Sequence, residues 1–307
     1  MNDDGASVEH DQWSEWLLHR RHGGDSSVID AMQVQIAKYT DRVLDGAGLA
    51  PGMTLLDIGA GEGLVSFQAI ERIGPSLRVM LTDISVPMLA HAAKLAKQRG
   101  VDSQCRFLAC AADNLAGIDD ESVDVVVTRA VLAYVDDKAG ALREFYRVLK
   151  PGGRLSICEP IMRDDAVLVY AMKALLAVPS PESSNRLFRL QHSIRSAQFP
   201  DTPEKIAQHP CTNFTERDLV HLAQGAGYQD VHMEFHIDVQ SVTQTSWQAF
   251  LESSPHPLAP SVRQIITDDF DASDRDYFIA QYRPVIEAGN TPGTTRTAFL
   301  TARKEAH

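Results

Sequence analysis

The 307-residue sequence predicts a doubly wound α/β fold that carries a helical cap. Between residues 54 and 159, short apolar runs alternate with segments of helical spacing, which is typical of a parallel sheet covered on both faces. Two long segments with helical patterns, 161–213 and 245–288, interrupt this alternation. Ligands of such sheets bind at the carboxyl ends of the strands, so we expect the site there, beneath the cap.

The elements of the core follow one another in a regular order. The first strand is predicted by MTLLDI, and residues 63–73 after it have apolar side chains at helical spacing. The second strand is predicted by LRVMLTD, and the next helix, VPMLAHAAKLAKQRG, ends at Gly100. Three further strands are predicted by CRFLAC, VDVVVT and RLSICE, with LREFYRVL as the helix before the last of them.

The flanking sequence predicts helices in residues 11–48 and a helix in FTERDLVHLAQGAGY with Thr215 as its N-cap. The segments VHMEFHIDV and TAFLTAR predict two more strands. We therefore expect four parts: an N-terminal helical lid (1–48), a ligand-binding core (49–160), a helical cap insertion (161–213), and the C-terminal part of the core (214–307) with an additional cap segment (245–288).

Charge and composition narrow the function. The formal net charge is −12 and basic residues never run beyond a pair, which disfavours a nucleic-acid partner. No apolar run approaches the about 18 residues of a membrane span, and the acidic N-terminus lacks the pattern of a signal peptide. The four cysteines lack metal-ligand spacing, so we expect free thiols and no metal. These features predict a cytoplasmic protein, monomeric or homodimeric, without a membrane partner.

The turn after the first strand carries the most specific signal. Gly59, Gly61 and Gly63 have the spacing G-x-G-x-G, whereas a pyrophosphate-binding dinucleotide turn has G-x-G-x-x-G. Asp57 before the glycines would repel a pyrophosphate and attract an ammonium group, and Asp83 at the end of the next strand suits a ribose. This set predicts a ligand with a ribose, a positive charge and no phosphate, such as S-adenosylmethionine (SAM). Taken singly, these residues also fit an ordinary strand-to-helix turn.

The segments LLDIGAGEG, LTDIS, SVDVVVTRAVLAYVDD and LREFYRVLKPGGRLSICEP, in this order, resemble the successive motifs of the class I SAM-dependent methyltransferases. They are similar to those of the quinone-biosynthesis methyltransferases. The resemblance implies a Rossmann-like, seven-stranded, mostly parallel sheet with a reversed last strand, which would be TAFLTAR. It also implies SAM as cofactor and S-adenosylhomocysteine (SAH) as product.

The resemblance also implies cofactor contacts. It assigns Gly59 and Gly61 to the methionine part of SAM with Asp57 beneath, Asp83 to the ribose, and Ile84 to the adenine. The loop before the fourth strand departs from the family pattern, because Ala111 stands where many relatives have an Asp. The remaining residues of the predicted cofactor site are Ala60, Gly63, Ala112, Asp113, Asn114 and Thr128.

Three residues are predicted on the acceptor side of the site. Arg129 and Tyr134 follow the fourth strand, and the Arg129 guanidinium would hold a carboxylate or phosphate. An ion pair of Arg129 with Asp136 is the structural alternative. Glu159 ends the fifth strand, where it would contact the acceptor, act as a base, or serve a structural role in the turn.

The N-terminal stretch WSEWLLHRRHGGD suggests a lid. Trp13 and Trp16 would shield the reacting methyl group, and Gly23-Gly24 would form a hinge. The basic side chains His19, Arg20 and Arg21 would meet a carboxylate of the acceptor or of SAM. The alternative is an amphipathic core helix with cations at its C-terminus.

Together these residues predict an enzyme that transfers a methyl group from SAM to a small acidic or zwitterionic acceptor, at O, N, S or C. Displacement at a sulfonium needs alignment and exclusion of water more than acid–base groups. The long cap favours an enclosed small acceptor. Two alternatives stay open: an NAD(P)-dependent oxidoreductase and a non-catalytic SAM-binding protein.

Overall fold

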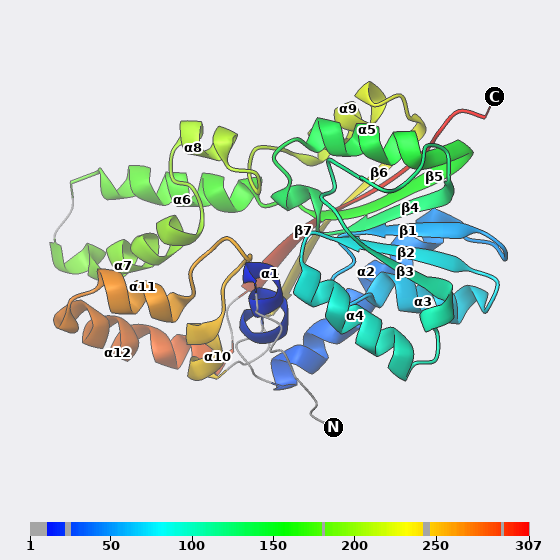
Figure 1. Cartoon of the computed structure of the whole chain (residues 1–307). Coiled ribbons are helices and arrows are strands. Elements are labelled where there is room, and N and C mark those ends of the chain that lie inside the picture. The colour runs from blue at the N-terminus through cyan, green and yellow to red at the C-terminus, as the bar shows by residue number, and fades with distance from the viewer. Residues whose placement is uncertain (1–10, 22–25, 180–181, 242–245, 290–291, 307) are drawn as a thin grey trace.

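The computed structural model describes residues 11–21, 26–179, 182–241, 246–289 and 292–306. Its centre is a seven-stranded sheet with the order β3-β2-β1-β4-β5-β7-β6. Figure 1 shows this sheet beside a separate group of helices, with the first helix between the two.

The sheet is parallel except for its last strand. The strands are β1 (Thr54–Ile58), β2 (Arg78–Asp83), β3 (Cys105–Ala109), β4 (Val123–Arg129), β5 (Leu149–Pro160), β6 (Gln229–Ser241) and β7 (Pro292–Arg303). Neighbours among β1 to β5 pair in parallel, whereas β7 is antiparallel to both β5 and β6. The predicted doubly wound, Rossmann-like sheet with a reversed last strand is confirmed.

Helices cover both faces of the sheet because its strands are apolar on both sides. Leu55 and Leu56, adjacent in β1, belong to the two opposite core clusters. The flanking helices are α2 (Ser26–Ala47), α3 (Leu64–Ile73) and α4 (Val86–Gln98) on one face, and α5 (Lys138–Val148) and α9 (Glu216–Gly225) on the other. Thr215 caps α9 as predicted, in a reciprocal capping box with Asp218.

A second group of helices lies to one side of the sheet (Figure 1). It consists of α6 (Arg163–Leu176), α7 (Glu182–Gln198), α8 (Pro203–Gln208), α10 (Trp247–Glu252), α11 (Val262–Asp269) and α12 (Ala272–Ala288). Helices α7, α10, α11 and α12 share their own apolar cluster, which includes the fully buried Phe278. The two cap segments, distant in sequence, thus pack on each other. None of the helices that the structure describes is long and apolar enough to cross a membrane.

The N-terminal part is divided between two layers. A short helix, α1 (Gln12–Glu15), and the π-helical turn η1 (Trp16–Arg20) lie between the sheet and the cap. Helix α2 instead packs on the sheet, where Val43 is buried and its carbonyl accepts a 2.8 Å hydrogen bond from Ser156 Oγ. Of the segment predicted as a lid (1–48), α1 and η1 lie beside the cap, whereas α2 belongs to the layer that covers the sheet. The predicted Gly23-Gly24 hinge lies outside the described residues.

Candidate active site

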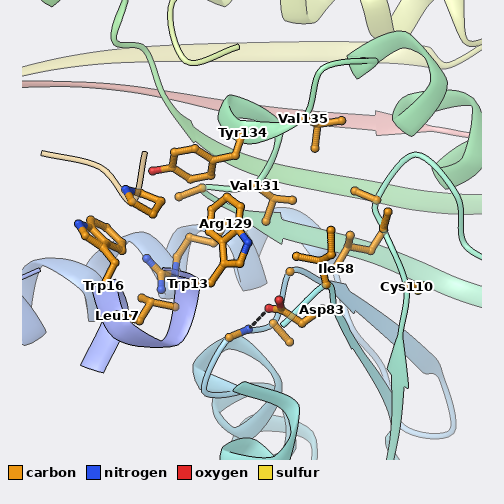
Figure 2. Close-up of a pocket in the computed structure, with 18 of the residues that line it drawn as sticks. Trp13, Trp16, Leu17, Ile58, Asp83, Cys110, Arg129, Val131, Tyr134 and Val135 are labelled. Carbon is orange, nitrogen blue, oxygen red and sulfur yellow. Dashed lines mark hydrogen bonds between the residues drawn. The ribbon is translucent and has the colours of Figure 1, made fainter. Parts of the chain in front are cut away.

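A cavity of about 320 Å³ opens at the carboxyl ends of β1, β2 and β4 (Figure 2). Its walls come from four places: the α1–η1 segment, the turn after β1, the loops after β2, β3 and β4, and the cap. Among the described residues, the cap contributes Pro257 to this wall. The cavity is thus assembled from segments that the sequence separates by more than two hundred residues.

The glycine turn holds the end of β2 in place. The Gly61 N–H donates to Asp83 Oδ2 at 2.8 Å, the bond drawn in Figure 2, and the Ser85 N–H donates to Asp83 Oδ1 at 2.9 Å. Burial raises the pKa of Asp83, and these two donors oppose that rise. The carboxylate still lines the cavity, at the position predicted for a ribose contact.

Glycine is required at this turn for two different reasons. Gly59 has φ +62°, and a Cβ there would lie 2.4 Å from Val131 Cγ2. Gly61 has φ +55°, and its open side faces the cavity beneath Leu17. Ala60 also lines the cavity, whereas Gly63 does not, because it packs against Phe67. The cofactor contact predicted for Gly63 is therefore corrected to a packing role between helix and strand.

Asp57 does not face the cavity. Its side chain is 1% exposed, and Oδ2 accepts a 2.7 Å hydrogen bond from Ser66 Oγ on α3. Burial raises the pKa of Asp57 to about 7. The predicted direct contact between this carboxylate and a ligand ammonium group is therefore not supported. Asp57 is instead a buried group beneath the turn.

The adenine end of the predicted site follows β2 and β3. Ile84 lies beside Asp83, lines the cavity and has 61% of its surface exposed. Ala112 and Asp113 line the cavity, as predicted. Asn114 does not, because its backbone N–H turns back to the Ala111 carbonyl in a tight bridge.

Arg129 and Tyr134 both reach the cavity (Figure 2). Arg129 Nε is buried without a hydrogen-bond partner, and no ion pair of Arg129 occurs among the described residues. The alternative ion pair with Asp136 is therefore not formed. Burial raises the pKa of Tyr134 well above its ordinary value, so the phenol stays protonated and offers a donor. The Tyr134 ring meets Trp13 edge-on, with centroids 5.5 Å apart.

The basic residues of the α1–η1 segment divide between the cavity and the cap. Arg21 lines the cavity, where burial and the nearby Arg129 charge lower the pKa of Arg21 to about 10. Arg20 instead donates to the Ala259 carbonyl at 3.0 Å, and His19 is exposed outside the cavity. The predicted ligand contacts of His19 and Arg20 are corrected accordingly. Trp16 lines the cavity and also donates through Nε1 to the Ser254 carbonyl at 3.2 Å.

Glu159 and Thr128 bond to the protein instead of a ligand. Glu159 is 0% exposed and accepts hydrogen bonds from Thr128 Oγ1 and the backbone N–H groups of Val131, Leu132 and Ala133 at 3.0–3.1 Å. Neither side chain lines the cavity. The predicted roles of Glu159 as base or acceptor contact, and of Thr128 in the cofactor site, do not fit this arrangement.

Sequence reasoning missed several residues of the wall. Glu62, Cys110, Val135 and Pro257 all line the cavity. Glu62 and Val135 adjoin predicted site residues and Cys110 lies two residues before Ala112, so proximity in sequence was the available signal. Nothing in the local sequence indicates that Pro257 returns to the site, because that contact depends on how the cap packs.

The donors and acceptors of the cavity fit SAM better than a dinucleotide. The Gly61 N–H, which a pyrophosphate would need, is already bonded to the Asp83 carboxylate. The Asp83 carboxylate can accept hydrogen bonds from a ribose. The exposed Ile84 side chain can pack on an adenine, and the Gly61 backbone, which has no side chain, can approach the methionine part. The NAD(P)-dependent alternative is not favoured.

Comparisons with known proteins agree. A family model described as a methyltransferase domain matches residues 49–227. The ubiquinone/menaquinone biosynthesis C-methyltransferase UbiE of Idiomarina loihiensis is 38% identical over 196 residues, 63% of this chain and 72% of that protein. A tRNA 5-carboxymethoxyuridine methyltransferase of Escherichia coli K12 is 36% identical over 117 residues, 38% of this chain and 43% of that protein.

Solved structures share the fold. The YcgJ protein of Bacillus subtilis is similar with a TM-score of 0.56 at 20% sequence identity, over 88% of this chain and 100% of that protein. The matched family model covers more than half of the chain and includes the glycine turn, Asp83 and the loop after β4. The chain belongs to the class I SAM-dependent methyltransferases, enzymes with SAM as their cofactor.

Proposed function

We propose that this enzyme methylates a small acceptor that carries a carboxylate or a similar anionic group. The observation that carries this proposal is the pair of guanidinium groups of Arg21 and Arg129 in one cavity, neither with an ion-pair partner among the described residues. Two like charges in a partly buried space are costly unless an anion joins them. An anionic ligand relieves that cost, and guanidinium groups bind carboxylates bidentately.

The two ends of the cavity divide the proposed roles. Asp83, Ile84 and the glycine turn form the end that we assign to SAM, with the backbone of Ala60 and Gly61 facing its methionine part. Ala112 and Asp113 complete the adenine contacts in this proposal. Arg129 and Tyr134, at the other end, would hold the acceptor, with the Tyr134 hydroxyl as a hydrogen-bond donor.

The α1–η1 segment is the proposed lid. Trp13 and Trp16 cover the cavity, and the bond from Trp16 to Ser254 ties the segment to the cap. Such a cover excludes water from the reacting groups and fixes their alignment. Arg21, from the same segment, would bring its charge to an anion only when the segment is in this position.

Bound SAM supplies a methyl group on a positive sulfonium, which leaves as a neutral thioether. The chain contributes alignment, an effect on the order of several kcal/mol, and a dry environment. A general base is needed only if the acceptor atom arrives protonated, and Glu159 is not among the residues that line the cavity. The Arg129 and Tyr134 donors would orient the acceptor toward the methyl group.

The relatives suggest both small and large acceptors. UbiE carries the name of an enzyme of quinone biosynthesis, and the second relative acts on tRNA. The net charge of −12 and the covered cavity favour the small acceptor for this chain. We also propose that the enzyme is a monomer or a homodimer and that it is cytoplasmic.

The test is transfer of labelled methyl groups from SAM to a panel of aromatic and aliphatic carboxylic acids, each paired with its neutral primary amide. We expect label in one or more acids and none in the matched amides. Label only in neutral compounds, or in tRNA, would contradict the acidic acceptor. Tight SAH binding without transfer to any compound would favour the non-catalytic alternative.

A further inference from the structure

The carboxylate of Glu159 binds a row of backbone amides. Glu159 Oε1 accepts from Val131 N and Leu132 N at 3.0 Å, and Oε2 accepts from Ala133 N at 3.1 Å. Thr128 Oγ1 adds a fourth donor at 3.1 Å. Successive backbone N–H groups of this kind form an anion-binding concavity, and here the chain supplies the anion itself.

These amides begin the loop of residues 129–136, which leads from β4 through the short turn η3 (Leu132–Tyr134). The loop carries Arg129 and Tyr134 into the cavity, and Val131 packs against Gly59. Its far end is also held by a buried charge, since Lys138 Nζ donates to the Val135 carbonyl at 2.8 Å and the Pro210 carbonyl at 2.9 Å. Buried groups of opposite charge therefore fix both ends of the loop.

The hydrogen-bond partners of Glu159 lie at the end of β4 and in the loop that follows it. Arg129 is not among these partners in the part of the chain that the structure describes. Both oxygens of Glu159 are taken by the amides of Val131, Leu132 and Ala133. Glu159 therefore acts on the loop through these amides, and Arg129, which lines the cavity, is carried by the same loop.

We propose that Glu159 is a positioning residue for methyl transfer, which holds the 129–136 loop so that Arg129 and Tyr134 face the acceptor. It acts through the loop and touches neither SAM nor acceptor. The role of Arg129 toward an anion rests on the proposed function, whereas the hold on the loop does not.

The test variant is Glu159→Gln. The glutamine side chain has the same size but only one acceptor oxygen, so its amide N–H₂ must face a backbone N–H. We expect hydrogen exchange at Val131, Leu132 and Ala133 to become at least about tenfold faster, because their acceptor is weakened. Exchange in β1 and the dissociation constant of SAH should change less than about threefold. Binding of benzoate to the SAH-saturated protein should weaken at least about tenfold.

The matched control is Asp124→Asn, at the opposite end of β4. Asp124 Oδ2 accepts the Thr54 N–H at 2.8 Å and Oδ1 binds Lys150, so this variant also loses a carboxylate that holds a backbone amide. It should leave exchange at residues 131–133 and benzoate binding unchanged. If Glu159→Gln fails to fold, Thr128→Val is the second variant. It removes one of the four donors to Glu159 and should give a smaller increase in hydrogen exchange at the same amides.

The outcomes separate the two proposals. In Glu159→Gln, hydrogen exchange at residues 131–133 could rise no more than hydrogen exchange in β1. That result would show that Glu159 is an ordinary structural residue and would overturn the inference. Benzoate binding that survives faster loop exchange would overturn it as well. If the unaltered SAH complex does not bind benzoate, but loop exchange responds selectively, the positioning role stands and the acidic acceptor fails.

Discussion

The two halves of the cavity differ in how completely the chain satisfies its own charged groups. In the half that we assign to SAM, Asp83 bonds to Gly61 and Ser85, and Asp57 beneath it bonds to Ser66. In the half that we assign to the acceptor, Arg129 keeps a buried Nε without a partner, and burial together with the Arg129 charge lowers the pKa of Arg21. In the proposed function the first half is preassembled for SAM, and an anion completes the second half.

This difference has an energetic reason. A preassembled half loses little freedom when it binds its cofactor, which is the same molecule in every turnover. Unpaired cations cost stability, and in the proposed function they increase selectivity for an anion. The predictions below test the division between the halves, beginning with the largest expected effect.

Gly61→Val should break the SAM half. A β-branched residue is strained at φ +55°, and its side chain would enter the cavity beneath Leu17. We expect the SAH dissociation constant, measured by calorimetry, to rise at least about 100-fold, which corresponds to about 3 kcal/mol. Gly52→Val is the matched control, because Gly52 also has a positive φ of +85° but no neighbour within 4 Å. Equal loss in both variants would attribute the effect to backbone strain instead of the site.

Arg129→Ala should affect only the acceptor half. Loss of a charged hydrogen bond to an anion costs about 1.5–3 kcal/mol, so we expect kcat/KM for an acidic acceptor to fall about 10- to 100-fold. The SAH dissociation constant should change less than about threefold, since SAM is held at the other end. The control is Arg143→Ala, which removes an exposed arginine whose Asp137 partner lies 3.6 Å away. If SAH affinity collapses in Arg129→Ala, Arg129 belongs to the cofactor half.

Asp57→Asn should change how stability depends on pH. The pKa of Asp57 is raised to about 7 in the folded protein, against about 3.9 in an unfolded chain. Between these values the folded state keeps a proton that the unfolded state has lost. The unfolding free energy therefore falls as pH rises from about 4 to about 7, by up to about 1.4 kcal/mol per pH unit.

The asparagine variant lacks this titration, so its stability relative to the unaltered protein should increase across the same pH range. Urea unfolding at pH 5, 6 and 7 measures the two curves. Parallel curves would show that Asp57 is already ionised beneath the glycine turn.

Trp16→Phe should have the smallest effect of these variants. It tests the hydrogen bond between Trp16 and the cap. It keeps an aromatic ring over the cavity but removes the Nε1 bond to the Ser254 carbonyl. One hydrogen bond of this kind contributes about 0.5–1.5 kcal/mol, so we expect SAH release, measured by stopped flow, to become a few times faster. Trp247→Phe, in the apolar cluster of the cap, should leave the release rate unchanged.

The sequence predicted the fold because its strands and helices follow from local periodicity. Alternating apolar runs and helical spacing indicated a parallel sheet, and the resemblance added the reversed strand that TAFLTAR provides. Asp83 reached the predicted position for the same reason, since strand ends of a parallel sheet meet at one edge.

The partners of individual side chains could not be predicted in this way. Asp57 turns to Ser66 because the packing of α3 brings that hydroxyl over the strand end. Glu159 meets amides that lie 26 to 28 residues earlier in the chain. Pro257 reaches the cavity only because the helices of the cap pack on one another. Each of these contacts depends on tertiary packing, which residue periodicity does not encode.

The pairing at the end of the sheet bears on how such an enzyme could acquire new acceptors. Ser241, the last residue of β6, pairs directly with Pro292, the first residue of β7. The intervening stretch, with α10 to α12 and Pro257, therefore leaves and rejoins the sheet at neighbouring positions. Exchange of this stretch for another of different length would preserve the strand register. It would also replace the apolar partners of α7 and the Ser254 carbonyl that binds Trp16. Evolution, or an engineer, can thus exchange this part of the proposed acceptor cover without changing the sheet, provided that the new stretch supplies both contacts.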